Sequence, residues 1–240
     1  MRFLPNARLR RAGAFSLPGL LLIKAGAFAL AWFVFPFWVS FALALYFYFI
    51  PFFHVSRLLF PFLLMLALAA WLPLAFWFAA MLGAIFFLIL GIKNLIFVNR
   101  FGNHQFLAFL ILFLIEFSFF SSVEHWSDWR TPFWSLGIAI VFFLMTRALF
   151  GYLSGESSRA DFVSIGTGAL LAWQIALGIL FLPFNPLYQT ALLFLTTVIV
   201  EDLLLERARS LILDPRKLLT DFSIFFLLAS FILASAEWTL

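Results

Sequence analysis

Residues 105–122 read QFLAFLILFLIEFSFFSS, an apolar run in which Glu116 is the one charged residue. A helix needs roughly 17–25 residues to cross the hydrocarbon core of a bilayer. Backbone groups cannot remain unpaired in lipid, and the alternating pattern of barrel strands is absent, so such a run must form a helix. This stretch therefore predicts a transmembrane helix, and most of the chain repeats its character.

The composition of the whole chain agrees with a membrane protein. Of its 240 residues, 65% are hydrophobic and only 11% are charged, whereas a soluble domain carries about 25% charged residues. The net charge of +4 comes from basic residues in short gaps between apolar runs, which indicates membrane orientation and not nucleic-acid binding. No Cys is present and the three His are far apart in the sequence, so neither a metal site nor a cofactor is expected.

Nine apolar runs of this kind predict an all-α polytopic transmembrane bundle with about nine spans. Pro36, Pro51, Pro61 and Pro73 mark either breaks between spans or kinks within longer ones, and two re-entrant or tilted pairs would leave seven spans. Asn185-Pro186, Thr131-Pro132 and Asp214-Pro215 each place a capping side chain before a proline, which favours a helix start. The expected spans are 17–35, 37–53, 59–78, 79–98, 105–122, 133–153, 161–182, 186–205 and 218–238.

The whole chain, residues 1–240, is expected to be a single integral membrane domain. Residues 1–16 form a basic N-terminal segment, and residues 206–217 form the longest loop. The first run resembles a signal peptide in outline, but Lys24 interrupts it and it continues past Ala31, which favours an uncleaved span.

Two independent counts predict the orientation. With the N-terminus in the cytoplasm, fourteen of the fifteen Lys and Arg residues lie on or toward the cytoplasmic side, and Arg130 is the exception. Eight of the nine Trp residues then lie at the outer interface, with Trp173 as the exception. We therefore expect a multi-pass protein of the plasma (inner) membrane with an extracytoplasmic C-terminus.

Polar groups at mid-membrane depth form the first candidate site. Glu116, Gln174, Thr196 and Thr197 lie at similar depths in three spans. They could line a pathway for protons, ions or a lipid head group. The alternative is a hydrogen-bonded cluster that holds helices together.

A second group lies in the cytoplasmic third of the spans. Arg147 is expected to form a buried ion pair with Glu201 or Asp202, because a guanidinium in lipid requires a carboxylate. A coupling-ion or substrate role is the alternative for this group.

The outer gap holds the third candidate, the acid–base residues Glu124, His125 and Asp128. Their spacing matches no motif with a known mechanism, so a solvated loop is the competing interpretation. A stripe of small residues at Ser164, Gly168, Ala172 and Ala176 predicts close helix packing.

These patterns favour a structural or assembly subunit of the cell envelope over an enzyme. The first alternative is a transporter, channel or lipid-handling protein that uses the mid-membrane polar residues. The second is a membrane enzyme that uses the outer cluster. The expected partners are membrane lipids, together with other membrane subunits or further copies of the chain.

Overall fold

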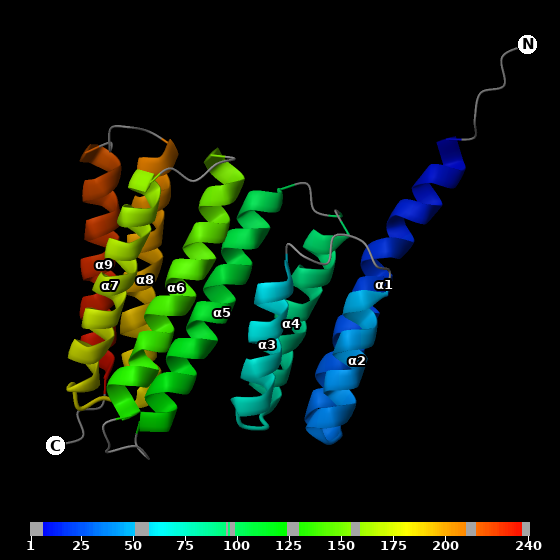
Figure 1. Cartoon of the computed structure of the whole chain (residues 1–240), viewed down its shortest axis with the longest axis horizontal. Helices are drawn as coiled ribbons and strands as arrows, with labels where there is room; N and C mark the ends of the chain where they lie inside the picture. The colour runs from blue at the N-terminus through cyan, green and yellow to red at the C-terminus, as the bar shows by residue number, and fades with distance from the viewer. Residues whose placement is uncertain are drawn as a thin grey trace, which may run out of the picture. The chain divides into compact units, whose positions relative to one another are not determined.

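The computed structural model describes residues 7–50, 58–94, 96, 99–123, 130–154, 159–209 and 215–236, with side chains at most of these positions from Pro18 onward. Within these ranges the chain forms nine α-helices and no strand (Figure 1). The predicted all-helical class is therefore confirmed. The helices are α1 (Ala7–Val34), α2 (Phe37–Phe49), α3 (Leu59–Trp71), α4 (Phe76–Lys93), α5 (Arg100–Val123), α6 (Arg130–Ser154), α7 (Arg159–Leu180), α8 (Pro186–Arg209) and α9 (Pro215–Ser235).

Prolines mark several of the helix ends, as the sequence predicted. Pro36 directly precedes α2, and α8 and α9 begin at Pro186 and Pro215. A proline lacks the N–H that would be unpaired in a first helical turn, so these starts lose no hydrogen bond. At α8 the Asn185 Oδ1 atom accepts a hydrogen bond from the Leu187 N–H at 3.1 Å.

Six of the helices are long and apolar enough to cross a membrane: α4, α5, α6, α7, α8 and α9. Three shorter apolar helices, Pro18–Val34, Phe37–Phe49 and Leu59–Trp71, occupy the region where the sequence left breaks or kinks open. The 13 residues of α2 extend only ~20 Å at the helical rise, less than the ~30 Å hydrocarbon core.

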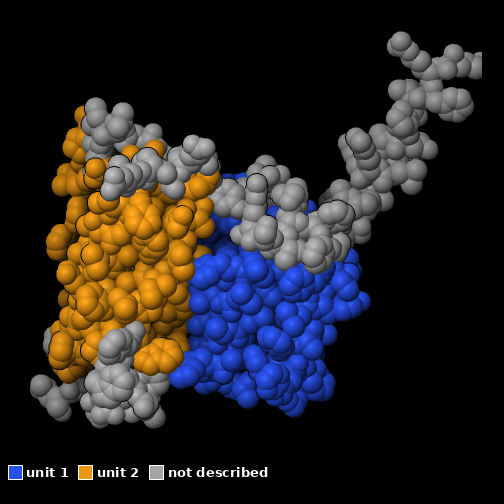
Figure 2. All heavy atoms as spheres, in the orientation of Figure 1, with its two compact units in different colours: residues 1–111 blue, residues 112–240 orange. Residues whose placement is uncertain are grey.

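The chain divides into two compact units, Met1–Ile111 and Leu112–Leu240, a division that the sequence did not indicate (Figure 2). The boundary falls within α5. We refer to them as unit 1 and unit 2.

In unit 1, α1 packs against α2 and α4, and α3 packs against α4. An aromatic cluster fills the interior: the rings of Tyr48 and Phe62 stack with centroids 4.0 Å apart, and Phe86 lies 4.8 Å from Phe28. The buried Trp32 indole N–H donates to the Ala69 carbonyl oxygen at 2.6 Å, which links α1 to α3.

In unit 2, successive helices α6 to α9 alternate in direction (Figure 1). Their core joins residues from α5, α6, α7 and α8, namely Phe119, Phe120, Ile138, Ala176, Ile179 and Leu193. The small-residue stripe of α7 packs inside this unit. A Cβ atom on Gly168 would lie 2.7 Å from Leu204 Cδ1 and 3.3 Å from Val200 Cγ1, so α7 and α8 approach closely there.

Candidate functional site

The main polar feature of unit 2 is the fully buried carboxyl of Glu116. This side chain is 0% exposed on α5, and Thr197 on α8 is also 0% exposed. The Thr197 hydroxyl lies 3.1 Å from Glu116 Oε1 and 2.9 Å from the Phe194 carbonyl oxygen. The sequence placed both residues in one mid-membrane layer, and the structure joins them across two helices.

The number of protons available on these groups restricts how they can bond. A threonine hydroxyl has one proton to donate, and a backbone carbonyl can only accept. Thr197 therefore donates its proton either to Glu116 Oε1 or to the Phe194 carbonyl oxygen, and both contacts are hydrogen bonds at once only when the carboxyl is protonated and donates to the hydroxyl. The hydroxyl proton can turn between the two acceptors.

A second buried carboxyl lies one helical turn from Thr197. Glu201 is 0% exposed, and neither of its oxygens has a hydrogen-bond partner among the described residues. Residues four apart share one face of a helix, so Thr197 and Glu201 point the same way from α8. The Glu116 Oε2 atom is likewise buried without a partner.

Thr146 on α6 adds a further buried oxygen, which has no hydrogen-bond partner in the part of the chain that the structure describes. Phe142 of α6 and Val200 of α8 both lie next to Gly168 of α7. These two residues are therefore at similar heights along their helices. Thr146 lies one turn beyond Phe142, and Glu201 follows Val200. Thr146 was not predicted from the sequence, although its four-residue spacing from Phe142 could have placed it on the inner face.

The free-energy cost of burying these two carboxyls can be compared with the free energy that their hydrogen bonds return. A charged side chain at the centre of a spanning helix costs about 2.5–3.5 kcal/mol on insertion scales. An interhelical hydrogen bond in a membrane returns only about 0.6–2 kcal/mol. Glu116 makes one such contact and Glu201 makes none among the described residues. The Thr197 contact therefore offsets part of the cost of burying Glu116, whereas no contact among the described residues offsets the burial of Glu201.

Two members of the predicted polar layer lie elsewhere. Gln174 is exposed on the outside of α7 and is not part of the Glu116 cluster. Thr196 is half-buried, and its hydroxyl bonds the Leu192 carbonyl of its own helix at 2.9 Å. Neighbouring residues point in different directions around a helix, so residues predicted at similar depths do not all meet.

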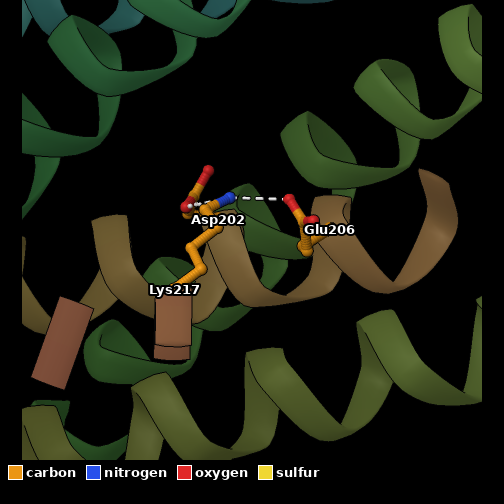
Figure 3. Close-up of polar contacts among 3 residues, drawn as sticks. All are labelled: Asp202, Glu206 and Lys217. Carbon is orange, nitrogen blue, oxygen red and sulfur yellow. Dashed lines mark hydrogen bonds and ion pairs between the residues drawn. The ribbon is translucent and has the colours of Figure 1, made fainter. Parts of the chain in front are cut away.

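The predicted ion pair of Arg147 is replaced by a different one. Lys217 at the start of α9 lies between two carboxylates of α8, with Nζ 3.2 Å from Asp202 and 2.6 Å from Glu206 (Figure 3). Arg147 is exposed, and its guanidinium lies 5.9 Å from the ring centroid of Phe162. The Arg147 prediction failed because Lys217 reaches Asp202 from the adjacent helix, while Glu201 points inward.

Trp173 lies toward the same end of unit 2 as Trp134. Its indole N–H donates to Ser135 Oγ at 2.8 Å, and Ser135 lies near the start of α6 beside Trp134. Both tryptophans therefore lie at the end of the unit opposite to Lys217.

Unit 1 holds a separate pair of cations around the end of α2. Lys93, the last residue of α4, is 2% exposed and donates to the Tyr48 carbonyl oxygen. Lys24 of α1 lies 3.5 Å from the Ile50 carbonyl oxygen. The sequence placed both lysines toward the cytoplasmic side but did not predict that they meet at one helix end.

The outer residues Glu124, His125 and Asp128 lie outside the described residues. His104 is buried on α5 and not in a gap between helices. Within the described ranges, no three His, Asp or Glu side chains are grouped so that they could hold a metal ion.

Comparison with models of protein families, with curated proteins and with solved structures finds no match to this chain.

Proposed function

We propose that this chain is a multi-pass protein of the plasma (inner) membrane whose unit 2 conducts protons through Glu116, Thr197 and Glu201. The six long apolar helices are compatible with a multi-pass membrane protein. The observation that supports the proton role is a pair of fully buried carboxyls, one bonded to the Thr197 hydroxyl and the other one helical turn from Thr197 on α8. Buried carboxyl chains within spans are typical of proton relays in transport proteins.

The proposed transfer balances once the Glu201 side chain turns to bring its carboxylate within hydrogen-bond distance of Thr197 Oγ1. The protonated Glu116 carboxyl passes its proton to Thr197 Oγ1, and the hydroxyl proton of Thr197 turns from Phe194 toward the Glu201 carboxylate. Thr197 ends as a neutral hydroxyl, Glu116 becomes a carboxylate and Glu201 becomes protonated. One proton thereby moves along the membrane normal by about one to two helical turns, or ~5–11 Å.

The orientation belongs to the same proposal. We place the N-terminus in the cytoplasm and the C-terminus outside, with an odd number of membrane crossings, nine or alternatively seven, because basic residues concentrate on the inner side. Glu201 then lies nearer the cytoplasm than Glu116, since α8 runs from its start at Pro186 toward Lys217. The relay would connect the outer and inner halves of unit 2.

Proton flux into liposomes tests the relay. The purified wild-type chain, reconstituted with an internal pH-sensitive dye and a potassium diffusion potential, is expected to acidify the vesicle interior. Glu116→Gln and Glu201→Gln should each lower that rate about tenfold or more, because an amide cannot take up and release a proton. Asp221→Asn on α9 removes a carboxylate elsewhere and should leave the rate unchanged. Absence of flux in the wild type, or equal rates in all four proteins, would contradict the proposal.

Assembly with other membrane subunits is a second candidate, supported by Gln174. An exposed amide within a spanning helix needs a hydrogen-bond partner that lipid cannot provide. A neighbouring subunit could supply it on the outer face of α7. We expect Gln174→Leu to reduce the oligomer fraction seen by crosslinking in membranes, whereas Leu171→Ala should have a smaller effect. Equal oligomer fractions in wild type and Gln174→Leu would exclude this role for Gln174.

A further inference from the structure

The distribution of acidic residues divides the chain at the boundary between the units. All 11 Asp and Glu residues lie after residue 111, between Glu116 and Glu237. Unit 1 contains eight basic residues and no carboxylate side chain: Arg2, Arg8, Arg10, Arg11, Lys24, Arg57, Lys93 and Arg100. Unit 1 therefore has no acidic side chain of its own to balance a buried cation.

Two of these cations meet at the C-terminal end of α2. Lys93 donates to the Tyr48 carbonyl oxygen and lies 4.7 Å from the centroid of the Tyr48 ring. Lys24 approaches the Ile50 carbonyl oxygen and lies 5.5 Å from the Phe47 ring centroid. The carbonyls of a last helical turn have no donors within the helix, so both lysines act as caps.

Capping accounts for the position of the lysines but not for their charge. The end of a helix dipole is equivalent to about −0.5 elementary charge, which is less than the full charge of the Lys24 ammonium group alone. Positive charge from Lys24 therefore remains at this helix end. Lys93 is buried and Lys24 is half-buried, so Lys24 is the group that an external anion can reach.

The surface around Lys24 is apolar. Leu20 and Ile23 on α1 are 50% and 68% exposed, and Ile50 on α2 is 50% exposed. A free anion gains nothing from these side chains. A phospholipid can place its phosphate on the ammonium group and its acyl chains along them.

We propose that the end of α2 in unit 1 binds the phosphate of an anionic phospholipid, with Lys24 in direct contact and the buried Lys93 behind it as a positioning charge. Basic pockets between helices on the cytoplasmic side are known to hold anionic head groups. The proposal is independent of the proton relay, since it uses no residue of unit 2.

Native mass spectrometry of the delipidated full chain in detergent tests this site. We expect phosphatidylglycerol to bind more tightly than phosphatidylcholine. Lys24→Gln should lower the affinity for phosphatidylglycerol about fivefold. Lys24→Arg should retain binding. Arg147→Gln removes an exposed cation from unit 2 and serves as the matched control. Lys93→Gln alters a buried group, so circular dichroism checks whether that variant folds. If Lys93→Gln does not fold, the conclusion rests on Lys24→Gln.

Three outcomes would overturn the proposal. Equal binding of the two lipids would show that charge plays no part. An equal loss of phosphatidylglycerol binding in Lys24→Gln and Arg147→Gln would show that any surface cation can bind the lipid. Displacement of phosphatidylglycerol by inorganic phosphate at equal concentration would assign the site to free phosphate and not to a lipid.

Discussion

The Thr197 hydroxyl lies 3.1 Å from Glu116 Oε1 and joins a carboxyl on α5 to the backbone of α8 through the Phe194 carbonyl oxygen, 2.9 Å away. This one hydroxyl connects two helices within unit 2. Its neighbour Thr196 bonds only the Leu192 carbonyl of its own helix. The two adjacent threonines therefore provide a test and its control.

Thr197→Val should destabilise the protein because it leaves the buried Glu116 carboxyl with no hydrogen-bond partner. Such an unsatisfied buried group costs about 1–3 kcal/mol. Thr196→Val has the same change in shape but removes only a bond within one helix, so its effect should be smaller. Unfolding in mixed detergent, followed by circular dichroism, measures both. Equal losses for the two variants would mean that the contact with Glu116 contributes nothing to stability.

Gly168→Val should also destabilise unit 2, through overpacking. Even the Cβ atom would lie 2.7 Å from Leu204 Cδ1 and 3.3 Å from Val200 Cγ1, and overpacking of this kind costs about 1–3 kcal/mol. Gly178→Val is the matched control, since nothing lies within 4 Å of a Cβ atom there. The thermal midpoints of the two variants in detergent should separate clearly. If the thermal midpoint of Gly178→Val falls as far as that of Gly168→Val, close packing of α7 on α8 is not the cause of the destabilisation.

Helix positions could be predicted from the sequence because lipid length and proline chemistry act locally. Apolar runs and the prolines before α2, α8 and α9 needed no knowledge of tertiary contacts. The angular position of a residue around its helix could not be predicted in the same way. In a bilayer, side chains that face lipid and those that face other helices are both apolar, so the sequence lacks the polar face that marks soluble helices.

This limitation explains why some residues that were predicted to be neighbours meet in the structure and others do not. Depth placed Glu116 and Thr197 in one layer, and the structure joins them. The same depth argument included Gln174, which points away from the cluster. Glu201 and Asp202 are adjacent in sequence and therefore point about 100° apart on the helix, so only Asp202 meets Lys217.

Lys217→Gln should lower stability slightly and make it less dependent on salt. The lysine contacts Asp202 and Glu206 at 3.2 and 2.6 Å but is 39% exposed at its side chain, and exposed ion pairs contribute about 0.2–1 kcal/mol. Arg147→Gln should show no salt-dependent change, because its guanidinium contacts the Phe162 ring and is in no ion pair among the described residues. Thermal midpoints at low and high salt distinguish the two. A larger salt effect for Arg147→Gln would favour the pairing predicted from sequence.

The proposed orientation predicts which single cysteines can be labelled from outside the cell. The chain contains no Cys, so each introduced thiol is the only one present. Asn99 is exposed between α4 and α5, and Phe181 is 84% exposed between α7 and α8. With the N-terminus in the cytoplasm, Phe181→Cys should react with a membrane-impermeant maleimide in intact cells, whereas Asn99→Cys should react only after permeabilisation. The opposite result at both positions would invert the orientation and the direction of the proposed relay. Labelling of both positions in intact cells would contradict an odd number of crossings between residues 99 and 181, and with it the alternating arrangement of α5, α6 and α7.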